Sequence, residues 1–139
     1  MISFFPPPCP QLPEFQTLLV RGTYHASAPV HLLLSHCSGT PGARAICLTP
    51  QRESFRNALV ELKDQWIEVH GGIGRTSAAA LRTEIFYPPT LAHLRLTLSM
   101  LHEYDDTVHH RKTTLAVAPT LLVLHELSAY FTAQATQAT

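Results

Sequence analysis

Two stretches of the sequence carry its clearest strand signals: Leu81-Arg82-Thr83-Glu84-Ile85-Phe86-Tyr87-Pro88-Pro89-Thr90 and Pro119-Thr120-Leu121-Leu122-Val123-Leu124-His125-Glu126-Leu127. Each contains a short apolar run with the composition of a buried strand. The predicted strands are residues 82–87 and 121–124. Between them, Thr90 is a good helix N-cap, and the leucines that follow recur at helical spacing on one face, at positions 91, 94, 98 and 101. We expect this helix to end near Tyr104 and a polar loop to follow at residues 105–114. A strand, a helix and a second strand in this order predict a βαβ unit with parallel strands.

The same pattern extends toward both ends of the chain. Apolar runs predict further strands at residues 30–35 and 44–49, and helical spacing predicts a surface helix over residues 53–69 and another helix from Ala129 onward. The predicted fold class is therefore α/β, a mainly parallel sheet flanked by helices. We expect a Pro-rich N-terminal arm at residues 1–20 that packs little, and one α/β domain at residues 21–139. The expected core residues are Leu33, Ile46, Leu59, Trp66, Phe86, Leu94, Leu98, Leu122 and Leu124.

Composition limits the possible functions. The chain has 139 residues, of which 45% are hydrophobic, and its ten basic and ten acidic residues give no net charge. Without a basic cluster, strong autonomous DNA binding is not expected. The three cysteines lack the spacing of a disulfide framework or a zinc site. No apolar run approaches the roughly 20 residues that span a membrane, so we expect no membrane association.

Two glycine-containing loops are candidates for phosphate binding, because phosphate-binding loops lie between a strand and a helix in parallel α/β folds. Gly39, Thr40 and Gly42 follow the predicted strand at residues 30–35 and form one candidate, although no lysine follows them. A plain tight turn is the stronger interpretation. The loop between Gly71 and Ser77 is a second candidate, and it would need a strand directly before it.

Metal chemistry has little support from the pattern. The strand that ends at Leu124 is followed by His125, where an ATPase would carry a magnesium-binding carboxylate, and only then by Glu126. The nine histidines show no helical pair with a partner carboxylate. We therefore assign no catalytic and no metal-binding residue, and we expect no cofactor.

The two opening stretches resemble segments of a known family. Phe86-Tyr87-Pro88-Pro89-Thr90, the leucine-rich helix, and the residues from Pro119 to Phe131 are similar to the SWIM-protein-associated member of the Shu complex, a divergent recombinase paralogue. The resemblance implies a partial RecA-like P-loop NTPase core. It also implies that Gly39, Thr40, Gly42, His125 and Glu126 occupy degenerate nucleotide-site positions, in which the Walker A lysine is absent and His125 replaces the Walker B aspartate.

The function implied by this resemblance is that of a non-catalytic accessory subunit in homologous recombination and DNA repair. Its partners would be a SWIM-domain zinc-binding protein and a recombinase, with single-stranded DNA bound only weakly or through the partner. Its location would be the nucleus. ATP and magnesium are not expected.

Two alternatives remain open. One is a small nucleotide-binding enzyme that uses the loop between Gly71 and Ser77 as an atypical phosphate site. The other is an orphan α/β interaction domain. The nucleotide-binding alternative requires a helix that opens near Gly74 directly after a strand.

Overall fold

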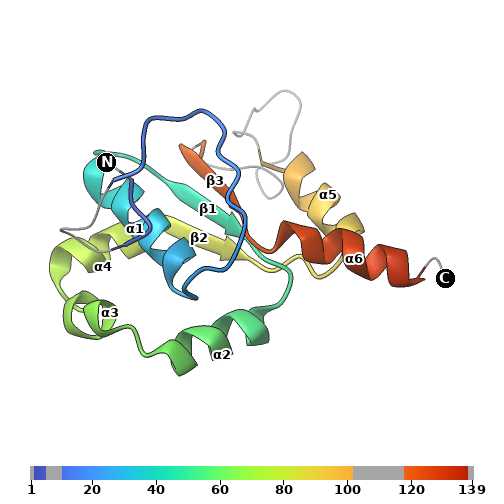
Figure 1. Cartoon of the computed structure of the whole chain (residues 1–139). Coiled ribbons are helices and arrows are strands. Elements are labelled where there is room, and N and C mark those ends of the chain that lie inside the picture. The colour runs from blue at the N-terminus through green and yellow to red at the C-terminus, as the bar shows by residue number, and fades with distance from the viewer. Residues whose placement is uncertain (1, 6–10, 102–117, 138–139) are drawn as a thin grey trace.

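Three parallel strands form the centre of the fold (Figure 1). The computed structural model describes residues 2–5, 11–101 and 118–137. The strands are β1 (Ala45–Leu48), β2 (Thr83–Phe86) and β3 (Leu121–Leu124). The helices are α1 (Ala28–Gly39), α2 (Arg52–Leu62), α3 (Gln65–His70), α4 (Gly74–Leu81), α5 (Leu91–Ser99) and α6 (Leu127–Gln137).

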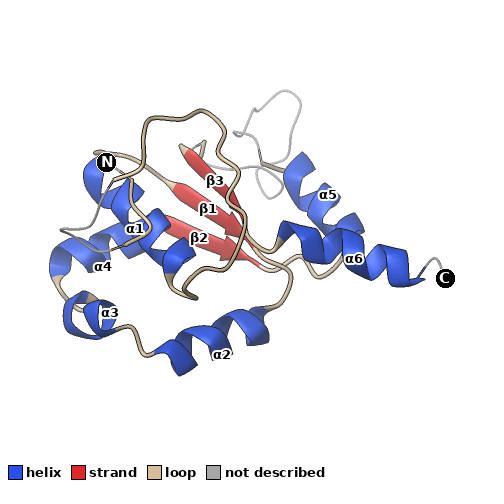
Figure 2. Ribbon diagram, viewed as in Figure 1, coloured by secondary structure: helices blue, strands red, loops and turns tan. Residues whose placement is uncertain are grey.

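The sheet has the order β2-β1-β3, and both strand pairs are parallel (Figure 2). Ala45 lies opposite Thr83 on one side and Leu121 on the other, and the register continues without a bulge to Leu48. The prediction of an α/β fold with a parallel sheet flanked by helices is confirmed. The strands predicted at residues 44–49, 82–87 and 121–124 are the three strands of this sheet.

One face of the sheet is well covered. Successive strand residues point to opposite faces, so Ala45 and Cys47 share a face. Both are buried in a cluster with Leu33 and Cys37 of α1 and with Ala79 of α4. The small side chains of Ala45, Cys47 and Ala79 allow α1 and α4 to approach the sheet closely. Contact with α1 and the sheet thus stabilises the short helix α4.

The described residues cover the second face only at its centre. Ile46 and Leu48 are buried against Leu91 and Leu94 of α5 and Tyr130 of α6. The flanking residues of the same face remain exposed, at 37% for Phe86, 42% for Leu122 and 38% for Leu124. The predicted burial of these residues is therefore wrong, as is that of Leu98, which is 38% exposed. Burial of Leu33, Ile46 and Leu94 is confirmed, whereas Leu59 and Trp66 are only half-buried.

The strand predicted at residues 30–35 is wrong, because this segment lies inside α1. Pro29 stands in the first turn of the helix, where its missing N–H costs nothing and its fixed φ favours the helical start. Leu33 and Cys37 pack on the sheet, whereas His31 contacts Asp64, the N-cap residue of α3. Short apolar runs fit either structure, and here the proline was the discriminating signal.

The helix predicted over residues 53–69 is split in two. Lys63 adopts a left-handed conformation with φ 51° and caps α2, and its amide donates to the carbonyl of Leu59. Asp64 then caps α3 by accepting a hydrogen bond from the Ile67 amide. The residues between Gly71 and Ser77 contain the start of α4, which follows α3 and not a strand.

The helix after Thr90 is confirmed, and its end at Ser99 is earlier than the predicted end near Tyr104. Thr90 caps it as expected, since its hydroxyl accepts from the His93 amide. The last helix begins at Leu127. Part of the N-terminal arm packs more tightly than expected, because Ser3 is buried and its amide donates to the hydroxyl of Ser35 at 3.0 Å. The predicted polar loop at residues 105–114 lies outside the described residues.

Candidate functional site

At the carboxyl ends of β1 and β3, the connections that leave the two strands run to opposite sides. From β1 the chain crosses to β2 on one side, and from β2 it passes to β3 on the opposite side of β1. In open parallel sheets such a switch point separates the loops on the two sides and is the usual location of a functional site. Here it lies between Thr49, directly after β1, and His125, directly after β3.

A hydrogen-bonded group of side chains occupies this switch point. His125 extends the β1–β3 ladder, since its amide donates to the Leu48 carbonyl at 2.9 Å. Its ring nitrogen Nδ1 lies 3.0 Å from the Thr49 hydroxyl, and Nε2 lies 2.7 Å from the Tyr24 hydroxyl. Tyr24 also donates to Glu126, and the Phe55 ring lies 5.4 Å from the His125 ring. We call Tyr24, Thr49, Phe55, His125 and Glu126 the carboxyl-edge cluster.

The partners assign the protons of the cluster. Because the Tyr24 hydroxyl donates to the Glu126 carboxylate, it must accept from His125 Nε2. Nε2 therefore carries the imidazole proton, and Nδ1 accepts from the Thr49 hydroxyl. The four groups form one chain of hydrogen bonds that runs from buried Thr49 to Glu126 at the surface.

Burial and charge keep most of this cluster neutral. Burial lowers the pKa of His125, and the nearby Glu126 carboxylate opposes this effect only in part. The pKa of Tyr24 is raised well above 10.0 by burial, by its hydrogen bond to Glu126 and by the charge of that carboxylate. At neutral pH the cluster is thus an imidazole, a phenol and a hydroxyl held beside one carboxylate.

The structure separates the two parts of the predicted nucleotide site. Gly39 ends α1, and Thr40 and Gly42 lie in the turn between α1 and β1, at the amino end of the sheet. His125 and Glu126 lie at the carboxyl end of β3. Gly42, with φ 74°, serves the tight turn between α1 and β1. The two glycines therefore lie at the opposite end of the sheet from His125 and Glu126, and the two groups cannot contact one common ligand.

The second candidate loop also lacks its required context. α4 opens at Gly74, but the element before it is α3, which ends at His70. The criterion of a strand followed directly by a helix is not met. Within residues 2–5, 11–101 and 118–137, no group of three or more histidine, cysteine, aspartate or glutamate side chains is arranged to hold a metal ion. In the same residues, no helix has the length and apolar content needed to cross a membrane.

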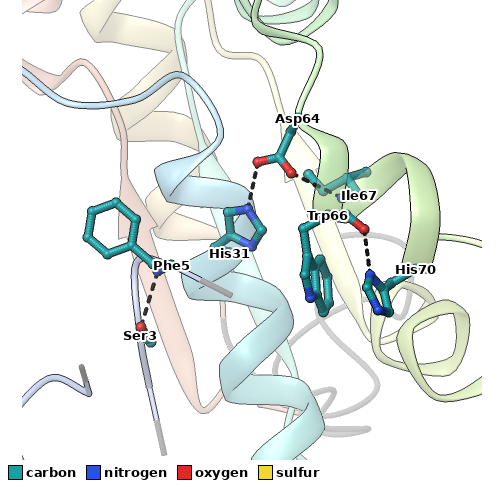
Figure 3. Close-up of polar contacts among 7 residues, drawn as sticks. All are labelled: Ser3, Phe5, His31, Asp64, Trp66, Ile67 and His70. Carbon is teal, nitrogen blue, oxygen red and sulfur yellow. Dashed lines mark hydrogen bonds and ion pairs between the residues drawn. The ribbon is translucent and has the colours of Figure 1, made fainter. Parts of the chain in front are cut away.

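A second polar cluster joins α1 to α3 (Figure 3). His31 Nε2 lies 2.8 Å from Asp64 Oδ2, and the other oxygen of Asp64 caps α3 through the Ile67 amide. Trp66 stacks on His70 and meets the edge of His31. Burial alone would raise the pKa of Asp64, but hydrogen bonds from Ser27, His31 and Ile67 and the charge of His31 together lower it to about 2. This cluster is interior and structural.

Tyr24 and Thr49 are the cluster members that sequence reasoning missed. Thr49 stands at the first position after a predicted strand, which is a signal that could have identified it. Tyr24 carries no such signal, because it is separated from His125 by 101 residues in the sequence and lies in no regular element. Only the folded chain places the two side by side.

Comparisons with protein-family models, with curated proteins and with solved structures found no match for this chain. The arrangement of the described residues is therefore the basis for inferring a function. Two features carry that inference: the carboxyl-edge cluster and the exposed flanks of the second sheet face.

Proposed function

We propose that the chain is a non-catalytic subunit that acts by binding a partner protein across the second face of its sheet. The observation that carries this proposal is the exposure of Phe86, Leu122 and Leu124, at 37%, 42% and 38%. Parallel sheets are normally covered on both faces. Large apolar residues left open on such a face are typical of a protein-binding surface.

The exposed residues belong to one surface. Phe86 and Leu124 flank Leu48 in the same register row, and Leu122 flanks Ile46 in the row beside it. The two central residues are buried by α5 and α6, which lie together toward the carboxyl ends of the strands (Figure 2). Burying the remaining apolar area would contribute about 25 cal/mol per Å², which favours association.

The loops at the carboxyl ends favour a binding role over phosphate chemistry. Phosphate loops need flexible glycines and several free backbone N–H groups. The loop after β1 contains Pro50 and no glycine, and the loop after β2 contains Pro88 and Pro89. Prolines have no N–H to donate.

The nature of the partner follows from the family resemblance. It points to an accessory role in homologous recombination, in complex with a SWIM-domain zinc-binding protein and a recombinase in the nucleus. The absence of net charge is consistent with contact to single-stranded DNA through the partner. The recombination role rests on the resemblance of a few segments, whereas the binding surface rests on the exposed sheet residues.

Affinity capture of the tagged chain from its native cells tests the proposal when it is run with matched variants. Leu122→Lys and Leu124→Lys place charges on the exposed face, and Leu81→Lys places one at an 82% exposed leucine at the end of α4. We expect the sheet-face variants to lose the partner while circular dichroism shows that they remain folded, and the Leu81 variant to retain it. A SWIM-type protein or recombinase among the lost proteins supports the recombination role. Capture that is unchanged by both sheet-face variants contradicts the binding surface.

A further inference from the structure

Tyr24 belongs to a segment that is otherwise loosely attached. Residues 11–25 form no helix or strand and are exposed or half-buried throughout. In Figure 1 this blue segment passes in front of the sheet before it enters α1. Among residues 11–24, all of which are described, the hydrogen bonds to the α/β core come from the Tyr24 hydroxyl. One side chain thus supplies the hydrogen bonds between this stretch and the α/β core.

The groups that receive Tyr24 match a phenol. His125 Nε2 offers a donor and Glu126 offers an acceptor, and these two atoms lie 3.8 Å apart. A hydroxyl can accept from the first and donate to the second at the same time. The tyrosine ring meets the His125 ring edge-on, with 5.6 Å between centroids. An apolar ring would form neither of these hydrogen bonds.

These receiving groups are held in place by the core and not by Tyr24. The His125 backbone continues the sheet ladder, Thr49 fixes its Nδ1, and the buried Phe55 packs against its ring. Glu126 adopts φ 57°, a left-handed conformation that is costly for a non-glycine residue and that is common at functional sites. The site is therefore built on rigid strand ends, whereas its occupant is on a loop.

We propose that His125 and Glu126 form a binding site for a phenolic hydroxyl and that Tyr24 is its intramolecular occupant. Release of residues 11–24 then opens the site to a phenol supplied by another molecule. The source is either a tyrosine side chain of a peptide or a small phenol. This inference concerns the carboxyl edge of the sheet and does not depend on partner binding at the second face.

The test compares the full chain with its Tyr24→Ala variant in NMR titrations with p-cresol. The tethered side chain competes with added p-cresol, so its removal should tighten the apparent affinity, by about tenfold where Tyr24 fills the site about 90% of the time. The shifts should centre on Thr49, His125 and Glu126. Toluene, which has the same ring without the hydroxyl, should bind much more weakly. Tighter binding of N-acetyltyrosinamide than of p-cresol would identify a peptide tyrosine as the source, and the reverse order a small phenol.

Equal affinity of the two proteins for p-cresol would overturn the proposal, as would equal binding of toluene or shifts that map elsewhere. Tyr24→Phe provides a second test that removes only the hydroxyl. In this variant, the 15N order parameters of residues 11–24 should fall while those of β1 and β3 are unchanged. Unchanged order parameters in residues 11–24 would show that the hydroxyl does not hold the segment.

Discussion

Asp64 is the residue at which helix capping and an interior ion pair coincide. One carboxylate oxygen caps α3 and the other contacts His31 of α1. Asn can retain the cap but not the charge, whereas Ala removes both. We expect Asp64→Asn to lower the free energy of unfolding by about 1 kcal/mol and Asp64→Ala by about 2 kcal/mol at neutral pH. Urea denaturation measures both values, with Glu61→Gln on the exposed surface of α2 as a control.

The pH dependence of Asp64 provides a separate check. The pKa of Asp64 is lowered from 3.8 to about 2 in the folded chain, so the unfolded state binds the proton first as pH falls. The stabilisation is complete above pH 3.8 and is lost as the pH falls toward 2. The stability difference between the wild type and Asp64→Asn should therefore shrink over this range. A constant difference would contradict the lowered pKa.

His125 should produce a pH effect nearer to neutrality. Its pKa is lowered from 6.5 by burial, so below this pH the unfolded chain takes up a proton more readily than the folded chain. Stability should then fall as the pH drops below 6.5. Thermal unfolding from pH 7.5 to about 5 should show a shallower decline for His125→Gln than for the wild type.

At the residue level, the sequence located part of the site. His125 and Glu126 were identified because the apolar run before them marks a strand end. Their proposed association with Gly39 and Gly42 depended on a strand at residues 30–35. Since that segment is α1, the glycines fall at the opposite end of the sheet. The wrong prediction of one element therefore placed the glycines beside His125 and Glu126 when they lie far from them.

The junction between α2 and α3 gives the sharpest prediction at the level of elements. Lys63 is left-handed, a conformation that costs a non-glycine residue about 1 kcal/mol and that glycine adopts freely. Lys63→Gly should therefore raise the free energy of unfolding by about 0.5–1 kcal/mol, as measured by urea denaturation. A continuous helix over residues 53–69 would show the opposite sign, because glycine inside a helix is destabilising.

Sequence periodicity identified elements well where it was supported by punctuation. Pro50 and Pro88 bounded β1 and β2, and Thr90 marked the start of α5. The split at Lys63 and Asp64 was missed because the apolar spacing continues through it, although Asp64 is a good N-cap residue. α4 was missed because the segment is too short for its spacing to predict a helix, and the burial of Ala79 depends on contact with α1 and the sheet.

On the scale of the whole molecule, the two sheet faces should respond differently to substitution. Leu33→Ala removes a side chain that is 1% exposed and should cost about 2–5 kcal/mol. Leu122→Ala removes a side chain that is 42% exposed and should cost about 1 kcal/mol or less. Chemical denaturation of both variants tests this contrast. Equal losses would mean that the second face is as well packed as the first.

The predicted core residues that proved to be exposed are themselves informative. Phe86, Leu122 and Leu124 have the composition of a buried strand, yet they are exposed in the part of the chain that the structure describes. Large apolar strand residues that stay exposed are typical of a surface that another protein covers. We therefore place the proposed binding surface here and not at the carboxyl-edge cluster.

Photo-crosslinking from the second face of the sheet tests whether a partner protein binds there. A benzophenone amino acid in place of Leu124, activated in the native cells, should yield a discrete adduct with a second protein. The same probe in place of Leu81, which is 82% exposed, should not. Absence of an adduct at Leu124, or adducts only with another copy of this chain, would contradict the account.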